Sequence, residues 1–251
     1  MSQPREPIFN IPAVVVAMLV VLVFVHLLRV YGLSPEDNQL LVWQAAFVPA
    51  RFAFGNLETA GWQHGFWLWT FVTYAFIHAD FVHLGFNSVW LLAFGTAVAR
   101  RFGAVRFLLL FAFSAIAGAA AHLFAHFGDL LPLVGASASI SGTMGAAARF
   151  AFQAGGPLDA WRTAEGDHGY RLPAAPLLKA LRDPRVLTFL GAWFGLNLLF
   201  GLGSLPIIGE DQSIAWEAHV GGFLTGLLLF AWFDPIRAGT GFTHNEESTW
   251  R

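Results

Sequence analysis

Three clusters of polar side chains stand at the starts of otherwise apolar stretches of this sequence. The clusters are Ser137, Ser139 and Ser141; His78, His83 and Asn87; and Glu217 and His219. Polar groups inside apolar segments are costly to bury, so they are functional candidates by default. Hydroxyl, imidazole and amide groups are those used in nucleophilic and general-base catalysis. The clusters therefore indicate acyl-transfer chemistry as a hypothesis.

Ser137 is the better nucleophile candidate of the three serines. Gly135 and the preceding Leu-Pro-Leu predict that a helix begins here, so its first-turn amides lack intrahelical partners and can bind an oxyanion. Ser141 would lie one turn on, on the same face, whereas Ser139 would point about 200° round the helix. The alternative is that the serines are small residues that let helices pack closely. We favour that interpretation for Ser139, and it stays open for Ser137.

His219 offers the base that a nucleophilic serine requires. In WEAHVGGFLTG, the residues His219, Gly222 and Gly226 share one predicted helical face. Glycines four residues apart let another helix approach closely, and the stretch around Ser137 has matching stripes of small residues. We therefore predict that this contact brings His219 within reach of Ser137. Three other histidines near helix ends are interpreted as interfacial residues: His26, His122 and His126.

His83 and Asn87 lie four residues apart in HADFVHLGFN and share one predicted helical face. Both can donate hydrogen bonds, as a developing oxyanion requires. The competing interpretation is a metal site made by His78, His83 and His219. It is the weaker one, because the sequence contains no HExxH motif. We expect no metal and no cofactor.

The composition indicates a membrane protein. Hydrophobic residues make up 56% and charged residues 12% of the chain, against about 25% charged in soluble domains. Apolar stretches long enough to span a bilayer predict six helices. They lie near 11–30, 80–99, 105–127, 136–154, 185–204 and 215–234. The first is interpreted as a retained span rather than a signal peptide, and the tryptophan-rich segment 31–79 as a long interfacial loop.

The distribution of positive charge predicts the orientation. With a cytoplasmic N-terminus, all of the 14 lysines and arginines except Arg29 and Arg51 fall on the inside, so both termini are expected in the cytoplasm. Residues 155–184 become an inside loop and 235–251 a cytoplasmic tail, while the three polar clusters lie at the outer side. The net charge of −2 and the scattered arginines do not indicate nucleic-acid binding. The absence of cysteine excludes disulfides and cysteine nucleophiles.

The motifs GASASISG, HxxxN and AHxGGFxxG together resemble the rhomboid family of intramembrane serine proteases. The resemblance covers about 11–234 and implies an all-α, polytopic six-helix bundle formed by one membrane domain, 1–234. It also implies a serine–histidine dyad that cleaves peptide bonds in or near transmembrane segments. The implied roles are Ser137 as nucleophile, His219 as base, and an oxyanion hole of His83, Asn87 and the Ser137 amide. The glycines expected to pack helices near the site are Gly135, Gly222 and Gly226.

The sequence departs from the family pattern at three places. Ala138 stands where the family's GxSG motif has its last glycine, which adds a methyl group at a crowded contact. Many members carry an aromatic residue one turn after the serine, where this chain has Ser141. We hypothesise that the Ser141 hydroxyl orients His219 instead. The Trp-Arg pair of the first loop is also lacking, and Arg51 is given no role.

Two other classes of function are weighed against the protease. A protease-like fold that only binds or escorts membrane proteins is kept open by Ala138, although the presence of both Ser137 and His219 argues against it. A proton-relaying transporter is disfavoured because the six spans show no inverted repeat. The expected location is a bacterial inner membrane, with the site opening to the outer side. The expected partners are the lipid bilayer and transmembrane protein substrates.

Overall fold

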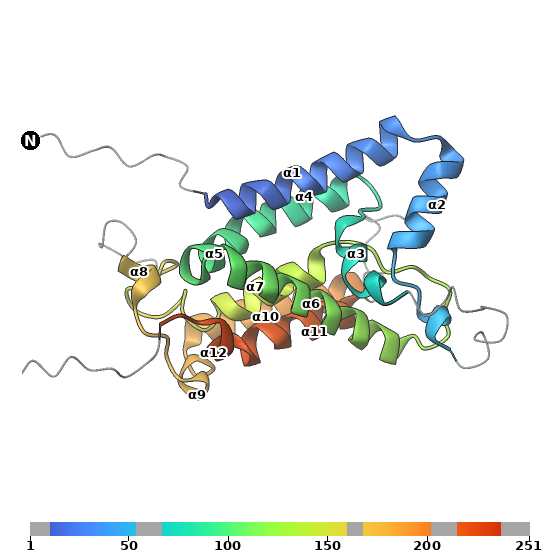
Figure 1. Cartoon of the computed structure of the whole chain (residues 1–251). Helices are drawn as coiled ribbons and strands as arrows, with labels where there is room; N and C mark the ends of the chain where they lie inside the picture. The colour runs from blue at the N-terminus through green and yellow to red at the C-terminus, as the bar shows by residue number, and fades with distance from the viewer. Residues whose placement is uncertain (1–10, 54–66, 160–167, 202–214, 237–251) are drawn as a thin grey trace, which may run out of the picture.

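The computed structural model describes residues 11–53, 67–159, 168–201 and 215–236. Within these ranges the chain is helical, and the extended pairing is limited to an antiparallel bridge between Phe47 and Leu133. The all-α prediction is confirmed (Figure 1). The elements are α1 (Ala13–Leu27), η1 (Leu28–Gly32), α2 (Pro35–Ala45), η2 (Pro49–Phe52), α3 (Thr70–Thr73), η4 (Tyr74–Phe76), α4 (Phe81–Trp90), η5 (Leu91–Gly95), α5 (Thr96–Phe102), α6 (Ala104–Ala125), α7 (Ser137–Ala147), α8 (His168–Arg171), α9 (Leu177–Ala180), α10 (Pro184–Gly201), α11 (Trp216–Leu228) and α12 (Phe230–Phe233).

Three helical segments among the described residues are long and apolar enough to cross a membrane. They are Ala13–Gly32, Phe81–Phe102 and Ala104–Ala125. They coincide, within a few residues, with the first three predicted spans. Their outward side chains include Val20 and Phe24, which are 61% and 62% exposed. Large apolar side chains left uncovered along a helix are typical of a surface that faces lipid.

Two predicted spans are shorter in the structure than expected. The span predicted at 136–154 forms a helix only as far as Ala147. Beyond it the chain tightens into turns, and the Arg149 guanidinium donates a hydrogen bond of 3.1 Å to the Leu227 carbonyl oxygen. This hydrogen bond gives the buried cation a backbone acceptor on α11. The span predicted at 215–234 is likewise divided, because α11 ends at Leu228 before α12 begins.

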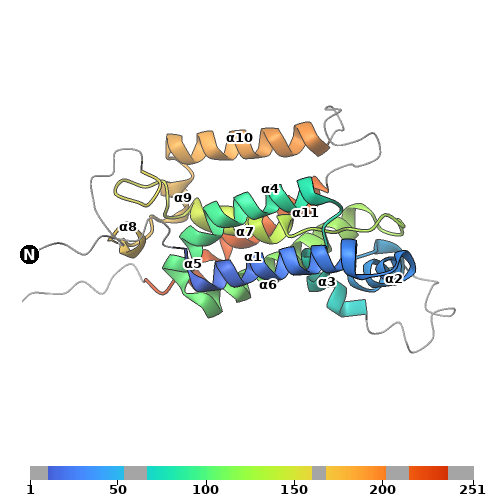
Figure 2. The same cartoon turned by 90° about the horizontal axis from the view of Figure 1, so that it is seen from above.

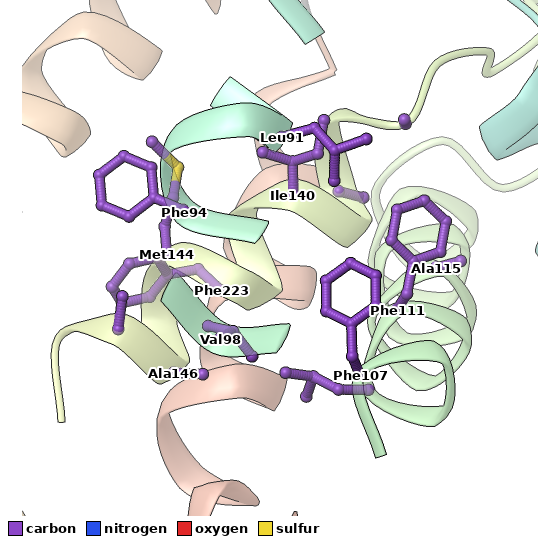
Figure 3. Packing of buried hydrophobic residues seen from close by; sticks show 14 of the residues in the cluster. Leu91, Phe94, Val98, Phe107, Phe111, Ala115, Ile140, Met144, Ala146 and Phe223 are labelled. Atoms are coloured by element: carbon purple, nitrogen blue, oxygen red, sulfur yellow. The ribbon is translucent and has the colours of Figure 1, made fainter. Parts of the chain in front are cut away.

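Helix α7 forms the centre of the bundle, with α6 and α11 packed against it (Figure 1). Each of its residues after Ser137 is buried. Figure 3 shows Phe94, Met144 and Phe223 interleaved on one side of α7, and Phe107 and Phe111 on the side that faces α6. The core therefore surrounds the helix that begins with the candidate nucleophile.

The contact between α7 and α11 is made by backbone atoms. A methyl group added at Gly222 would lie 1.9 Å from the Ala138 carbonyl oxygen, and one at Gly226 would lie 1.8 Å from the Gly142 carbonyl oxygen. Any side chain at either glycine would push the helices apart, as expected for small-residue packing in membranes. The two helices therefore pack with Gly222 opposite Ala138 and Gly226 opposite Gly142.

Helix α6 accommodates the methyl group of Ala138. A methyl group added at Gly118 of α6 would lie 2.5 Å from the Ala138 Cβ atom. The family pattern has glycine at position 138, so the Ala138 methyl group is an addition. It occupies space that Gly118 on the neighbouring helix leaves free. This pairing explains how α7 and α11 stay in close contact despite the departure from GxSG.

Helix α10 lies at the edge of the bundle, away from α1 and α6 (Figure 2). One stripe of its residues, spaced four apart, contacts the rest of the protein. Trp193 stacks on Phe223 with ring centroids 4.4 Å apart, and Phe189 packs 5.4 Å from Phe94. Most other side chains of α10 are exposed. The helix is attached by this stripe, which continues to Asn197.

The predicted interfacial loop, 31–79, contains helical pieces in its described part, and Arg51 organises them. The Arg51 guanidinium lies over the rings of Trp43 and Trp67, at 4.3 and 3.9 Å from the ring centroids. It also donates a hydrogen bond of 2.9 Å to the Ala46 carbonyl oxygen. No role was predicted for Arg51, and the structure corrects this, since its cation–π and hydrogen-bond contacts join parts of the loop.

Gly226→Ala is expected to destabilise the protein by about 1–3 kcal/mol or more, because the added methyl group collides with a backbone oxygen that cannot swing away. The midpoint of denaturant unfolding in detergent micelles measures the change. Gly191→Ala is the matched control, since nothing lies within 4 Å of a methyl group added there on α10. Equal stability of the two variants would contradict the close contact between α7 and α11.

Candidate active site

Ser137 and His219 are joined by a hydrogen bond. Ser137 is the first residue of α7, His219 lies in the first turns of α11, and the Ser137 Oγ atom is 2.7 Å from the His219 Nε2 atom. Both residues are partly buried. The glycine contact between the two helices sets this distance, because it fixes how closely their first turns approach. The structure thus brings together the two residues predicted from separate motifs.

The other ring nitrogen of His219 is held by Asn197 of α10. The Nδ1 atom is hydrogen-bonded to the Asn197 Oδ1 atom. This contact corrects the hypothesis that Ser141 orients His219, because both ring nitrogens already have partners and no hydrogen bond joins Ser141 to the ring. Asn197 was missed in the sequence, although a polar residue inside the predicted span 185–204 is itself a signal of function.

The Asn197 amide also fixes which nitrogen of His219 carries the proton. The Asn197 Nδ2 atom donates a hydrogen bond of 2.8 Å to the Trp193 carbonyl oxygen, which can only accept. The Oδ1 atom of the same amide must then face His219, and it accepts a hydrogen bond from the Nδ1–H group. This leaves the Nε2 atom unprotonated and able to accept the Ser137 hydroxyl proton. The Trp193 carbonyl oxygen, through Asn197, therefore selects the His219 tautomer that a general base requires.

His83 and Asn87 of α4 lie beside the start of α7. A methyl group added at Gly135 would lie 2.6 Å from the His83 ring, so this ring packs directly on the glycine two residues before Ser137. Gly135 has a φ of 111°, a conformation that favours glycine. Asn87 is buried one turn further along α4, and its Nδ2 atom donates a hydrogen bond of 2.9 Å to the His83 carbonyl oxygen. The structure places His83 against the segment that leads into Ser137.

His78 is buried next to the same segment. Its Nε2 atom accepts a hydrogen bond of 3.5 Å from the Ala136 amide, and its ring contacts the His83 ring edge-on at 5.1 Å. The alternative metal site of His78, His83 and His219 gains no support. In the described part of the chain, the group of side chains with ligand atoms within 4.8 Å of one another is a different one, His122, His126 and Glu217.

Glu217 pairs with His122 and His126, two histidines that we interpreted from the sequence as interfacial residues. The His122 Nδ1 atom lies 2.6 Å from the Glu217 Oε1 atom, and His122 is 6% exposed. The interpretation was therefore wrong for His122. It was also wrong for His26, which is buried against Phe81 with ring centroids 4.6 Å apart. Each of these two histidines is buried against a residue distant in sequence, Glu217 for His122 and Phe81 for His26. Helix periodicity alone cannot locate such partners.

The sequence matches the family model of the Rhomboid domain over residues 66–234. That range covers more than half of the chain and includes every residue of the candidate site. The chain belongs to the rhomboid family. Together with the apolar helices, this membership makes it an integral membrane protein.

Three rhomboid proteins illustrate the similarity. The chain is 38% identical over 95 residues to Rhomboid protease GluP of Bacillus subtilis, covering 38% of this chain and 18% of GluP. It is 40% identical over 168 residues to Rhomboid protein 1, mitochondrial, of Saccharomyces cerevisiae, covering 63% of this chain and 40% of that protein. It is 29% identical over 170 residues to Rhomboid protease GlpG of Yersinia pseudotuberculosis, covering 66% and 48%. The matched regions thus span less than half of each relative's length.

Asn197→Ala is expected to slow the reaction of Ser137 with a fluorophosphonate by roughly 10–100-fold. The substitution leaves the His219 Nδ1 atom without its hydrogen-bond partner, and an unpaired buried polar group costs about 1–3 kcal/mol of free energy. The observed rate constant of labelling measures the effect. Asn197→Asp keeps an acceptor for Nδ1, so it should retain more reactivity than the alanine variant. Wild-type rates for Asn197→Ala would contradict the assignment of Asn197 as a positioning residue.

Proposed function

We propose that this rhomboid protein is an intramembrane serine endopeptidase that cleaves peptide bonds in or near transmembrane segments of membrane proteins. The observation that carries the proposal is the 2.7 Å contact between the Ser137 Oγ and His219 Nε2 atoms. Membership of the family and the similarity to relatives named as proteases support it. No cofactor is needed, because the dyad supplies both nucleophile and base.

The first half of the reaction is acylation of Ser137. The hydroxyl oxygen attacks the carbonyl carbon of the scissile peptide bond as the His219 Nε2 atom takes the hydroxyl proton. Asn197 keeps the ring oriented and accepts a hydrogen bond from the Nδ1–H group, so that it stabilises the imidazolium that forms. His219 then gives the proton to the leaving amine as the peptide bond breaks. The products of this half are a new amino terminus and an acyl-enzyme on Ser137.

The negative charge on the carbonyl oxygen needs donors during this step. Ser137 is the first residue of α7, so its amide has no intrahelical acceptor and lies at the positive end of the helix dipole. We assign this amide, His83 and Asn87 to the oxyanion hole. The packing of the His83 ring on Gly135 supports the assignment.

Hydrolysis of the acyl-enzyme repeats the same transfers with water. His219 removes a proton from a water molecule as its oxygen attacks the acyl carbon, and it then returns the proton to the Ser137 oxygen. Water must reach the dyad from one side of the membrane, and the partial exposure of Ser137 and His219 is compatible with this.

We propose the full topology on the same basis. The domain 1–234 would have six spans, three of which coincide with the long apolar helices, while α7, α10 and α11 with α12 would provide the others. Both termini would be cytoplasmic, with 235–251 as a tail, and the dyad would open to the outer side of a bacterial inner membrane. The charge distribution supports this orientation. Residues 1–10 of the domain and 237–251 of the tail lie outside the described residues.

Reaction with a fluorescent fluorophosphonate separates a protease from a fold that only binds membrane proteins. We expect wild-type protein in detergent to be labelled and to cleave a transmembrane test substrate, and Ser137→Ala and His219→Ala to do neither. Ser141→Ala is the matched control and should behave as wild type, because Asn197 rather than Ser141 holds the ring. An unlabelled wild-type protein that leaves the substrate intact would overturn the proposal in favour of a binding or escort role.

Asn87→Ala is expected to lower kcat for the same substrate by about 10²–10³-fold, because one oxyanion donor is lost. Ser88→Ala provides the control, since Ser88 makes an equivalent hydrogen bond of 2.8 Å to the carbonyl oxygen four residues before it. Ser88→Ala should leave kcat within a few-fold of wild type. Equal losses in both variants would show that α4 is merely disturbed and that Asn87 is no donor.

A further inference from the structure

A second cluster of ionisable side chains lies at the end of the bundle that holds the dyad. His122 is in the last turn of α6, His126 follows that helix, and Glu217 is in the first turn of α11. Their ligand atoms lie within 4.8 Å of one another. The Glu217 Oε1 atom is 2.6 Å from His122 Nδ1 and 3.2 Å from His126 Nε2. The proposed protease mechanism uses none of the three.

The types of side chain in this cluster match a particular class of metal ion. Two imidazoles and one carboxylate form a ligand set that Zn²⁺ uses with a water molecule in the fourth position. Ligand atoms around a tetrahedral zinc lie about 3.3 Å apart. The two distances from Glu217 are 2.6 and 3.2 Å, so small side-chain shifts would open the site for the ion. Hard cations such as Ca²⁺ and Mg²⁺ prefer oxygen ligands and fit this set poorly.

Asp129 supplies an independent observation in favour of a metal. Its Oδ2 atom lies 2.9 Å from His126 Nδ1, while the opposite ring nitrogen, Nε2, faces Glu217. A histidine that binds zinc through one ring nitrogen usually donates its other N–H group to a carboxylate or carbonyl oxygen. The carboxylate of Asp129 therefore fixes the tautomer of His126 that leaves Nε2 free to bind a metal.

The burial of the three side chains also suits a site that an ion can enter. The side chains of His122 and Glu217 are 8% and 11% exposed, whereas that of His126 is 39% exposed. The His122 Nδ1 atom is the ring nitrogen that faces Glu217 and would bind the ion. His126 would form the accessible side, where a water molecule completes the coordination.

We propose that His122, His126 and Glu217 form a binding site for Zn²⁺. The ion would join the end of α6 to the first turn of α11, two residues before His219. Asp129 would orient His126 without touching the metal. Nothing in this proposal requires that the dyad be active.

The test is a calorimetric titration with Zn²⁺ of the full chain, purified through a histidine-free tag and stripped with EDTA. We expect one bound zinc per chain in the wild type and an affinity at least about 10-fold lower in His126→Ala, which removes one of three protein ligands. Asp129→Asn should lower the affinity by about 10-fold, within the range typical of such outer partners. His168→Ala, which changes an exposed histidine on α8, is the matched control and should bind as wild type.

Thermal unfolding provides a second measurement that does not depend on peptide cleavage. Zn²⁺ should raise the unfolding midpoint of the wild type and of His168→Ala but not that of His126→Ala. Without metal the midpoints should agree, because the side chains of His126 and Asp129 are 39% and 52% exposed and their loss leaves the core intact. Absence of zinc binding by the wild type, or equal affinities in His126→Ala and His168→Ala, would overturn the proposal.

Discussion

The direct backbone contact between α7 and α11 is the constraint on which the rest of the site depends. Gly222 and Gly226 face carbonyl oxygens of α7 so closely that no side chain fits between the helices. This contact sets the separation of the first turns of the two helices, and with it the distance between Ser137 and His219. Lipid offers no hydrophobic force that drives helices together, so close packing and interhelical hydrogen bonds must hold them.

Four helices each contribute one element of the proposed chemistry. Helix α7 brings the serine, α11 the histidine, and α4 the His83 ring that packs on the segment before the serine. Helix α10 brings Asn197, which holds the far side of the histidine ring. Because α10 is attached to the core mainly through one stripe of residues, the orientation of His219 is sensitive to the position of this edge helix (Figure 2).

Features that depend on a local sequence pattern could be predicted from the sequence. Features that depend on a contact with a further residue, distant in sequence, could not. Ser137 and His219 were predicted as a pair because glycines mark a close helix contact without reference to anything else. The Ser141 hypothesis was wrong because helix periodicity gives a face but not the neighbour, which is Asn197. Hydropathy overestimated the length of α7, because the apolar sequence continues beyond Ala147, where the helix ends.

The most direct test of the account locates the reactive atom among three serines spaced two residues apart. The protein is treated with a fluorophosphonate and digested, and the modified peptide is sequenced by tandem mass spectrometry. We predict a single adduct on Ser137. Ser139 is buried and donates a hydrogen bond to the Phe111 carbonyl oxygen, and the ring nitrogens of His219 are hydrogen-bonded to Asn197 and Ser137 rather than to Ser141. An adduct on Ser139 or Ser141, or substrate cleavage that persists without an adduct on Ser137, would contradict it.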